Sequence, residues 1–452
     1  MTKIFTRDKT FYRVFFPLVL TITAQTVIAL AVNLADNVML GAYSETSLAG
    51  AALVNQLQFI LQQIVSGVGA GVVVIGSQYW GKNEADPIKR VMSLGLKFAL
   101  MFGVIFWAVT FFAPRQILWL LTSDISVIDA AAEYMRVMCW TYIIFAATNV
   151  LTLSLQSVRS AMIGTVMSVV TLFVNVTLNY MLIFGNFGMP RLGITGAAIA
   201  TLISRILELA TIVIYILLID KKLRFKLNEL LRFDFTYLKD YLRAAVPLVL
   251  SGAQWGVAQA AQIAILGHIS GEAIAANSIA VIIFELFCML GFSCSSAASV
   301  TIGNTVGSGR LDAIKPYSRT LQAIFLVIGL VSGAGIFIFK ETFVSLFEVS
   351  PETSALAIQF LIVLAVTTVG TCYEYPVESG IIGGGGNTKY AGIVDITFMW
   401  IFTLPVSALS AFVWELPPVV TFCFLKADQI LKCIPNAIYC NSYKWVRKLT
   451  RD

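Results

Sequence analysis

The chain has 452 residues, of which 58% are hydrophobic and only 12% are charged, with a formal net charge of +6. Soluble domains carry roughly 25% charged residues, so this composition excludes a soluble protein. The apolar residues instead form runs of about 20 or more, the length at which a helix crosses the hydrocarbon core of a membrane.

These runs, taken in chain order between polar loops, predict twelve membrane-spanning helices. The charged segment before the first run is not followed by a cleavage pattern, so we expect the first span to be retained. A segment with four consecutive glycines, Ile381–Tyr390, is predicted as a turn. The predicted spans are 14–37, 51–76, 91–113, 133–155, 161–184, 193–219, 244–267, 273–300, 318–339, 354–380, 390–413 and 417–439.

The Lys and Arg residues of the loops divide unequally between the two sides of this layout. The loops and tails on one side contain 23 of them, whereas the other side has only Arg115, Arg191 and Lys340. Cytoplasmic loops carry the excess of Lys and Arg, and an even number of spans places both ends on one side. We therefore expect a multi-pass protein of the cell membrane with both termini in the cytoplasm.

The chain is predicted to consist of two halves joined by its longest charged loop. We expect an N-terminal six-helix bundle at 1–219, a cytoplasmic linker at 220–243 and a C-terminal bundle with a tail at 244–452. A shift of 226 residues aligns several positions of the two halves, among them Gly81 with Gly307. Six spans per half make the repeats parallel, so we expect an all-α membrane fold that alternates access by rocking one half against the other.

Several ionisable residues fall inside the predicted spans, where a charge costs a few kcal/mol and therefore indicates function. Arg205 and Glu208 are spaced i, i+3, which favours an intrahelical ion pair. For Asp395 and Asp428 a structural role and a role in transport both remain open. The full set is Asp36, Arg205, Glu208, Glu285, Glu374, Glu378, Asp395 and Asp428.

In the first half, Asp36 is the strongest candidate for binding a coupling ion. Asn175 and Asn179 lie one helical turn apart in the fifth span, and Thr201 reaches a similar depth in the sixth. One carboxylate, two amides and a hydroxyl form an oxygen cage that suits Na⁺, and a desolvated aspartate can carry a proton instead. The alternative is that Asp36 faces a wet vestibule and that the asparagines join helices.

In the second half, the candidates for substrate binding or coupling are more scattered. Glu374 and Glu378 are one turn apart, and Glu378 lies near the inner end of its span, where it can also face water. Glu285 lies in the middle of the eighth span. Gln259 is one of four glutamines in the spans that begin with a proline, and these side chains contact either substrate or one another. The four are Gln25, Gln254, Gln259 and Gln262.

Sequence motifs across the whole chain resemble the multidrug and toxic compound extrusion (MATE) family, in particular its bacterial NorM-like branch. The motifs are Leu178–Pro190 followed by Leu192–Thr201, Asn33–Asp36, Gln78–Gly81, and the positions Asp395, Trp400, Pro405, Asp428 and Lys444–Trp445. The resemblance implies a V-shaped pair of bundles that exports drugs or metabolites in exchange for Na⁺ or H⁺. It also implies that the carbonyl of Ala197 joins Asp36 in a cation site. Two acids of NorM-like relatives are replaced here by Trp255 and Cys372.

The remaining features disfavour an enzyme. The only histidine, His268, falls in a predicted external loop, and the seven scattered cysteines form no CxxC pair. The four glycines are not followed by Lys-Ser or Lys-Thr, so they form no phosphate-binding loop. We expect no cofactor, no metal beyond a Na⁺ at Asp36, and no nucleic-acid partner. We expect a monomer in the lipid bilayer that acts on a small organic, cationic and amphiphilic substrate. Flippase activity on lipid-linked or other metabolites, and a passive channel, are the alternatives.

Overall fold

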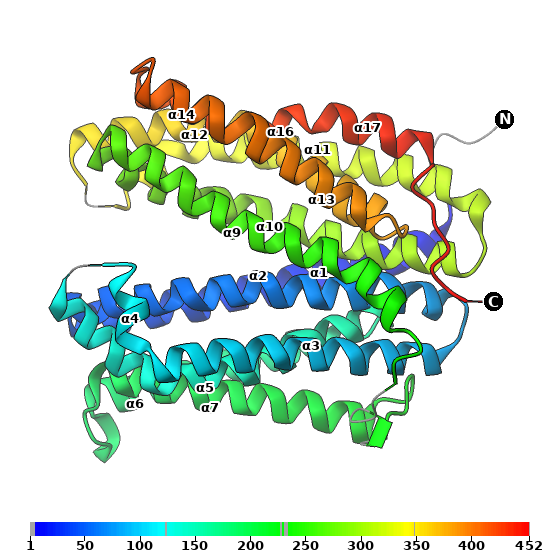
Figure 1. Cartoon of the computed structure of the whole chain (residues 1–452), viewed down its shortest axis with the longest axis horizontal. Coiled ribbons are helices and arrows are strands. Elements are labelled where there is room, and N and C mark those ends of the chain that lie inside the picture. The colour runs from blue at the N-terminus through cyan, green and yellow to red at the C-terminus, as the bar shows by residue number, and fades with distance from the viewer. Residues whose placement is uncertain (1–4, 123, 227, 230–233, 348, 452) are drawn as a thin grey trace. The chain divides into compact units, whose positions relative to one another are not determined.

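The computed structural model describes residues 5–122, 124–226, 228–229, 234–347 and 349–451, which are mostly helical (Figure 1). The helices of the first half are α1 (Lys9–Tyr43), α2 (Glu45–Gly81), α3 (Ala85–Phe112), α4 (Pro114–Trp119), α5 (Ile125–Ser157), α6 (Met162–Phe184), η1 (Asn186–Gly188), α7 (Gly193–Ile214) and η2 (Tyr215–Ile219). Those of the second half are α9 (Leu238–Ile269), α10 (Gly271–Gly307), α11 (Leu311–Val344), α12 (Pro351–Tyr375), η3 (Pro376–Gly383), α13 (Thr388–Ile396), η4 (Thr397–Thr403), α14 (Leu404–Phe412), α15 (Pro418–Leu425), α16 (Asp428–Leu431) and α17 (Cys433–Ser442).

Each of the twelve predicted spans falls on helix, and ten helical segments of the described chain are long and apolar enough to cross a membrane. The other two predicted spans coincide with α9 and with the series α15 to α17. The helix α9 begins with charged residues and carries several glutamines, which lowers its hydropathy. The series α15 to α17 is interrupted at residues 426–427 and at Lys432, so none of its pieces is long enough alone.

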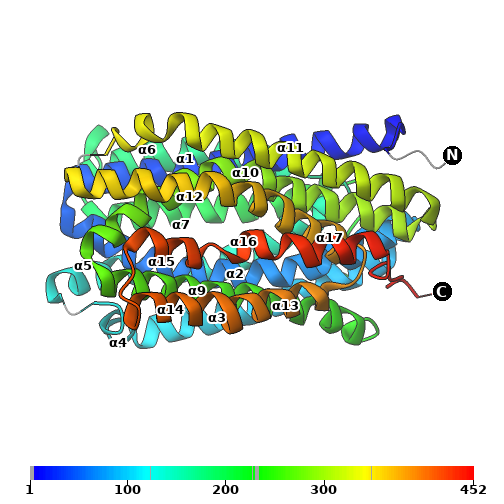
Figure 2. The ribbon, with the colours of Figure 1, turned by 90° about the horizontal axis from the view of Figure 1, so that it is seen from above.

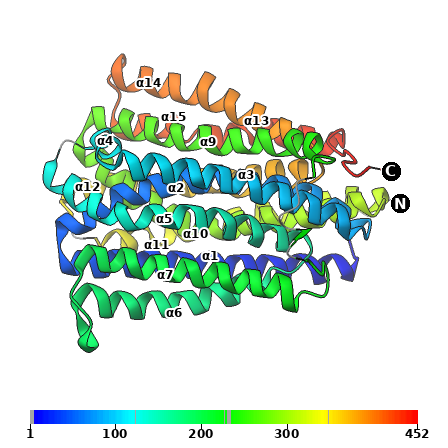
Figure 3. The same cartoon turned by 60° about the horizontal axis from the view of Figure 1, so that its bottom comes forward.

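The chain divides into two compact units, which are described separately. Unit 1 comprises residues 1–20, 77–83 and 250–452, and unit 2 comprises residues 21–76 and 84–249. Within unit 1, α12 packs against α10 and α11 (Figure 2). Within unit 2, α5 packs against α3 and α7, and α7 packs against α6 (Figure 3). The linker residues before α9 belong to unit 2, where Glu229 forms an ion pair with Lys89 at 3.1 Å.

Each unit has an apolar core of its own. The core of unit 2 includes Leu40, Val54, Met135 and Ile194, which come from four different helices. In unit 1 the rings of Phe360 and Phe422 stack with their centroids 4.0 Å apart, among buried side chains from α9 to α15. Stacked rings of this kind add about 1 kcal/mol to the burial of their surface.

The ends of the helices repeat along the chain with the shift of 226 residues found in the sequence. The helix α2 spans residues 45–81, and α10 spans residues 271–307. The same shift relates the last residues of α1 and α9, and the first residues of α3 and α11, of α5 and α12, and of α6 and α13. Helix boundaries shift by a residue or two with small changes in geometry, so this agreement over five helices of each half indicates an internal duplication.

Two glycines related by this shift form a reciprocal helix crossing within unit 1. A Cβ atom on Gly81 would lie 2.1 Å from the carbonyl oxygen of Asn304, and a Cβ atom on Gly307 would lie 1.8 Å from that of Gln78. The residues Gln78 and Asn304 are themselves related by 226. Small residues let two membrane helices approach this closely.

The chain around the four glycines differs from the predicted turn. Residues 381–383 continue the helix, which turns only at 384–387, and Thr388 already begins α13. The segment is buried: a Cβ atom on Gly385 would lie 2.1 Å from the ring of Trp445, and Gly386 has φ +105°. The wide π-helical turn η3 begins at Pro376, which has no N–H to donate within a regular helix.

Candidate functional site

The candidate coupling site of unit 2 centres on Asp36 of α1. The Nδ2 atom of Asn179 donates a hydrogen bond to Asp36 Oδ1 and lies 3.1 Å from the Oδ1 atom of Asn175. Asn175 is 1% exposed and Asn179 is fully buried, whereas Asp36 is partly buried. The structure therefore joins three of the predicted residues in one hydrogen-bonded chain.

The position of the two amides follows from the local structure of α6. Asn175 and Asn179 are one turn apart on the face of α6 that is buried together with Leu182 and Ile183. The helix ends at Gly185, which adopts φ +77° and allows the chain to return into α7. An apolar helix thus holds two amides at fixed depth opposite α1.

Helix α7 carries the other two predicted residues. Ala197 is 2% exposed and belongs to the same core as Leu40, which lies one turn beyond Asp36. The hydroxyl of Thr201, one turn after Ala197, is buried beside the phenol of Tyr134. No contact of Ala197 or Thr201 with Asp36 is among those of the described residues.

Two further side chains act on Asp36 electrostatically. The guanidinium of Arg205 forms the predicted ion pair with Glu208, with Nη1 and Oε2 2.8 Å apart, and this prediction is confirmed. Arg205 and the phenol of Tyr134 both lie within electrostatic range of Asp36. Tyr134 lies at the start of the predicted fourth span, and nothing in the sequence distinguishes it from an aromatic residue of the membrane interface.

Two buried oxygen atoms at this site make no hydrogen bond within the described part of the chain. They are Oγ1 of Thr201 and Oδ1 of Asn179, although the Nδ2 atom of the same Asn179 amide is bonded. A buried acceptor without a partner costs about 1–3 kcal/mol unless a donor or a cation reaches it. The amide oxygen and the carboxylate of Asp36 are ligands that fit Na⁺, and the carboxylate alone fits a proton.

In unit 1, the structure gathers four carboxyl groups around a lysine, which we name the Lys432 cluster (Glu374, Glu378, Asp395, Asp428 and Lys432). The Nζ atom of Lys432 lies 3.5 Å from Glu374, 3.1 Å from Asp395 and 3.4 Å from Asp428. Glu378 accepts a hydrogen bond of 2.9 Å from Asn436. It is 2% exposed, so it does not face water.

Lys432 was not among the candidates identified in the sequence, although a signal for it existed. It lies inside the predicted twelfth span, four residues after Asp428, where the two side chains share one helical face. A second lysine, Lys426, occupies the same span and donates to Gln262 at 2.9 Å. An ammonium group in an apolar span requires a partner just as a carboxylate does.

The other candidates of the second half lie apart from this cluster. Glu285 has an exposed side chain on α10, and Gln259 is partly buried; neither makes a hydrogen bond to another described residue. Gln254 accepts a hydrogen bond of 2.9 Å from Trp400. His268 lies in the last turn of α9 and not in a loop, because the helix continues two residues beyond the predicted span.

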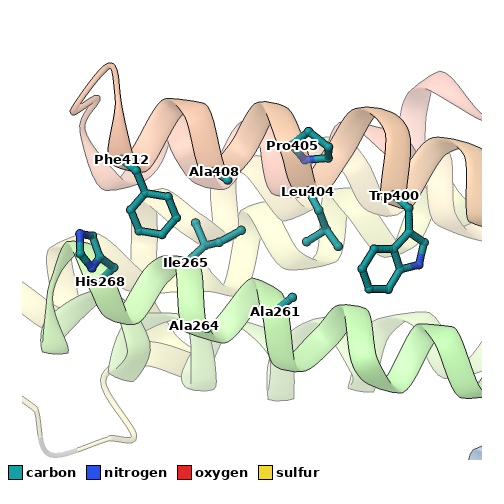
Figure 4. A pocket seen from close by; sticks show the side chains of 9 residues that line it. All are labelled: Ala261, Ala264, Ile265, His268, Trp400, Leu404, Pro405, Ala408 and Phe412. Carbon is teal, nitrogen blue, oxygen red and sulfur yellow. The ribbon is translucent and has the colours of Figure 1, made fainter.

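An apolar pocket of about 510 Å³ opens between α9 and the segment that runs from η4 to α14 (Figure 4). The rings of His268 and Phe412 meet edge to face at one end, with centroids 4.5 Å apart, and Trp400 lies at the other. No charged side chain is among its lining residues, so it suits an apolar group. The lining residues are Ala261, Ala264, Ile265, His268, Trp400, Leu404, Pro405, Ala408 and Phe412.

Comparison with known proteins places these features in a family context. The model of the MatE family matches residues 17–181 and 247–409, which is well over half of the chain. The chain is 25% identical over 447 residues to a probable multidrug resistance protein NorM of Thermotoga maritima, covering 96% of this chain and 94% of that protein. It is 22% identical over 408 residues to the uncharacterized transporter YisQ of Bacillus subtilis, covering 89% and 88%.

Solved structures share the fold over the whole length. An outward-facing multidrug resistance MATE family transporter of the MOP superfamily matches with a TM-score of 0.88 and 19% identity, covering 100% of both chains. A MOP superfamily transporter from Pyrococcus furiosus matches with a TM-score of 0.87 and 18% identity, also over 100% of both. The fold of this chain is therefore that of these membrane transporters.

Proposed function

The chain belongs to the MatE family, whose members are transporters and not enzymes, and from this premise we propose that it is an antiporter that exports small organic molecules in exchange for Na⁺ or H⁺. The observation that carries the proposal is the chain of hydrogen bonds between Asp36, Asn179 and Asn175 inside apolar helices. A carboxylate in this position costs a few kcal/mol, which a purely structural group does not require.

The chemistry of the site supports reversible binding of a coupling ion. Arg205 is paired with Glu208, so its charge is largely neutralised and does not bind Asp36 directly. The carboxylate of Asp36 can therefore bind one cation from the solution. Loading Asp36 with Na⁺ or H⁺ removes its charge, and this change in charge is what distinguishes the two states of the carrier.

The proposed substrate is a cationic amphiphile. The relative NorM of Thermotoga maritima is named a probable multidrug resistance protein, and this supports export of drug-like molecules here. The chain contains 31 Phe, 15 Tyr, 8 Trp and 12 Met residues, whose rings and thioethers accommodate cationic and apolar groups of varied shape. We propose that the carrier acts as a monomer in the cell membrane.

The test is uptake of ethidium into everted membrane vesicles, in which export points inward, under a sodium gradient or a pH gradient imposed separately. We expect one gradient to drive ethidium against its concentration difference. We expect Asp36→Asn to lower this uptake at least tenfold while the protein is still expressed. A matched control is Asp129→Asn, because Asp129 is an exposed acid of the same unit.

The same experiment separates the alternatives. A passive channel equilibrates ethidium but never concentrates it, and a flippase specific for lipid-linked metabolites does not accumulate ethidium under either gradient. Full gradient-driven uptake in Asp36→Asn would refute the assignment of the coupling site, and absence of gradient-driven uptake in the natural sequence would refute the antiport itself.

A further inference from the structure

The segment that follows α17 connects three sequence motifs that the proposed function leaves unexplained. They are Gln78–Gly81 at the end of α2, the four glycines at 383–386, and Lys444–Trp445 within the segment itself. All three belong to unit 1. We name residues 443–451 the C-terminal strap, which follows α17 as the red trace in Figure 1.

The first part of the strap is anchored in the core of unit 1. Trp445 is fully buried, and its Nε1 atom donates a hydrogen bond of 2.7 Å to the carbonyl of Cys440 in α17. The N–H of Arg447 donates to the carbonyl of Gly385 at 2.9 Å. A Cβ atom on Gly386 would lie 2.6 Å from the carbonyl oxygen of Arg447. The glycines therefore allow the strap to lie directly against the backbone at this point.

The second part of the strap binds the last turn of α2 through its own backbone. The side-chain amide of Gln78 accepts a hydrogen bond of 2.7 Å from the N–H of Leu449. The same amide donates one of 3.0 Å to the carbonyl of Arg447. The Gln78 side chain is fully buried, so these two bonds satisfy an amide that would otherwise lack partners in the interior.

The end of the strap makes a further pair of contacts with the same stretch of chain. The N–H of Arg451 donates to the hydroxyl of Tyr79 at 3.0 Å, and its carbonyl accepts from the ammonium of Lys82 at 2.8 Å. The side chains of Arg447, Lys448 and Arg451 are exposed, so they bury little apolar surface. A segment held mainly by backbone hydrogen bonds near the surface opens more readily than packed helices do, because water replaces the lost partners.

Helix α2 is shared between the two units, which gives its end a mechanical role. Residues 45–76 belong to unit 2, whereas residues 77–83 belong to unit 1. In unit 1 this end packs on α10 through the reciprocal contact of Gly81 and Gly307. A movement of one unit against the other strains the attachment of this end. The crossing and the strap both hold it, so the strap can control how long it stays attached.

We propose that the C-terminal strap is a latch of the transporter, which holds the end of α2 on α10 while the cytoplasmic side is closed. The latch lifts from Gln78, with Trp445 as its fixed anchor, when the carrier opens to the cytoplasm. This inference rests on the proposed export function and on the predicted orientation of the chain. It adds a control of access to the coupling chemistry at Asp36.

The first arm of the test is hydrogen–deuterium exchange of the purified full-length protein in detergent, followed by mass spectrometry of the strap. Gln78→Leu removes both hydrogen bonds of the amide, and we expect the strap to exchange about tenfold faster. The matched control is Gln116→Leu, because Gln116 is an exposed glutamine of α4. A strap that exchanges freely in the natural sequence, or equally slowly in Gln78→Leu, would overturn the latch.

A second pair of variants tests the backbone contact without changing α2. Leu449→Pro removes the N–H that Gln78 accepts, whereas Leu449→Ala keeps it. We expect the proline variant to speed exchange in the rest of the strap, and the alanine variant to do so much less. Combining Leu449→Pro with Gln78→Leu should add little, since both break the same contact. Equal effects of proline and alanine contradict the proposed contact.

The second arm asks whether the strap controls the end of α2. Val306 lies beside Gly307 in the last turn of α10 and is 3% exposed, so Val306→Cys reports when this region opens. Everted vesicles are treated with a membrane-impermeant thiol reagent, and peptide mass spectrometry locates the label. We expect Gln78→Leu to raise labelling at this position about tenfold. Faster exchange of the strap with unchanged labelling would show a fixture that controls nothing.

The third arm uses the ethidium uptake assay. A weakened latch leaves more carriers open to the cytoplasmic side and competent to bind ethidium, so we expect Gln78→Leu to lower KM at least threefold. An unchanged or higher KM contradicts the latch. Absence of gradient-driven uptake in the natural sequence contradicts the proposed export function instead, and exchange and labelling still decide whether the strap holds the end of α2.

Discussion

At the scale of single residues, the two units place carboxyl groups in the membrane in different ways. Asp36 is held by neutral amides, so an external cation can bind it. Glu374 and its neighbours already share an internal ammonium group, so what they can still gain is protons. Both arrangements satisfy the rule that a buried charge needs a partner, but only the first leaves room for a metal cation.

A residue at the start of α1 gives a prediction outside the spans. The carboxylate of Asp8 accepts hydrogen bonds from the hydroxyl of Tyr317 and from the backbone N–H of Thr10, and it lies 3.7 Å from Arg310. These groups, the hydroxyl foremost, hold the pKa of Asp8 below its ordinary value of 3.8. Because the folded state favours the ionised form, Asp8 stabilises the protein above pH 3.8 and ceases to do so as pH falls through the lowered pKa.

We therefore expect Asp8→Ala to lower the free energy of unfolding by about 1 kcal/mol at pH 7, since it removes a helix cap. The difference in the free energy of unfolding between Asp8→Ala and the natural sequence should shrink in acid. Asp8→Asn keeps the helix cap and should therefore lower the free energy of unfolding by less. Thermal unfolding in detergent at several pH values measures this, and a difference that grows in acid would contradict the role given to Asp8.

At the scale of elements, the duplicated helices carry different chemistry at matching positions. Asp36 lies seven residues before the end of α1, and Gln262 lies seven residues before the end of α9. Thr201 and Lys426 each lie eight residues after the start of α7 and α15. The position of Asp36 is thus taken in the second half by an amide, which accepts a hydrogen bond of 2.9 Å from a buried ammonium group.

A double-mutant cycle tests whether Gln262 and Lys426 stabilise each other. Gln262→Leu leaves the buried ammonium of Lys426 without its hydrogen bond, and we expect a loss of about 3 kcal/mol in stability. Lys426→Met leaves the amide oxygen unpaired, which costs about 1–3 kcal/mol. The double variant should lose less stability than the sum of the losses in the two single variants. The control is Gln259→Leu on the same helix, and additive losses would show that the pair is not coupled.

The reciprocal crossing of α2 and α10 gives a second prediction for elements. Alanine at Gly81 or at Gly307 places a methyl group against a backbone carbonyl, so we expect each to lower stability by about 1–3 kcal/mol. The two losses should be similar and less than additive, because both open the same contact. Gly256→Ala serves as the control, since a Cβ atom there meets nothing within 4 Å and should not destabilise the helix.

At the scale of the whole molecule, the unequal distribution of loop charges predicts how the chain lies in the membrane. We expect a green fluorescent protein fused after the last residue to fluoresce and alkaline phosphatase at the same place to be inactive. Phosphatase inserted at Gly188, between α6 and α7, should be active because that turn is predicted to be external. The reverse pattern of reporter activities would show that the chain lies in the membrane with the opposite orientation.

The sequence by itself determined the helices on which the twelve predicted spans fall, the internal duplication, and the neighbourhood of Asp36, Asn175 and Asn179. Run length, loop charge and depth along a helix are local properties, and the membrane imposes them on each span separately. The tertiary structure alone decided that Lys432 forms ion pairs with three carboxyl groups, that Glu378 is buried, and that Lys426 binds Gln262. Each of these contacts depends on the rotation of one helix against another, which packing sets and no single span encodes.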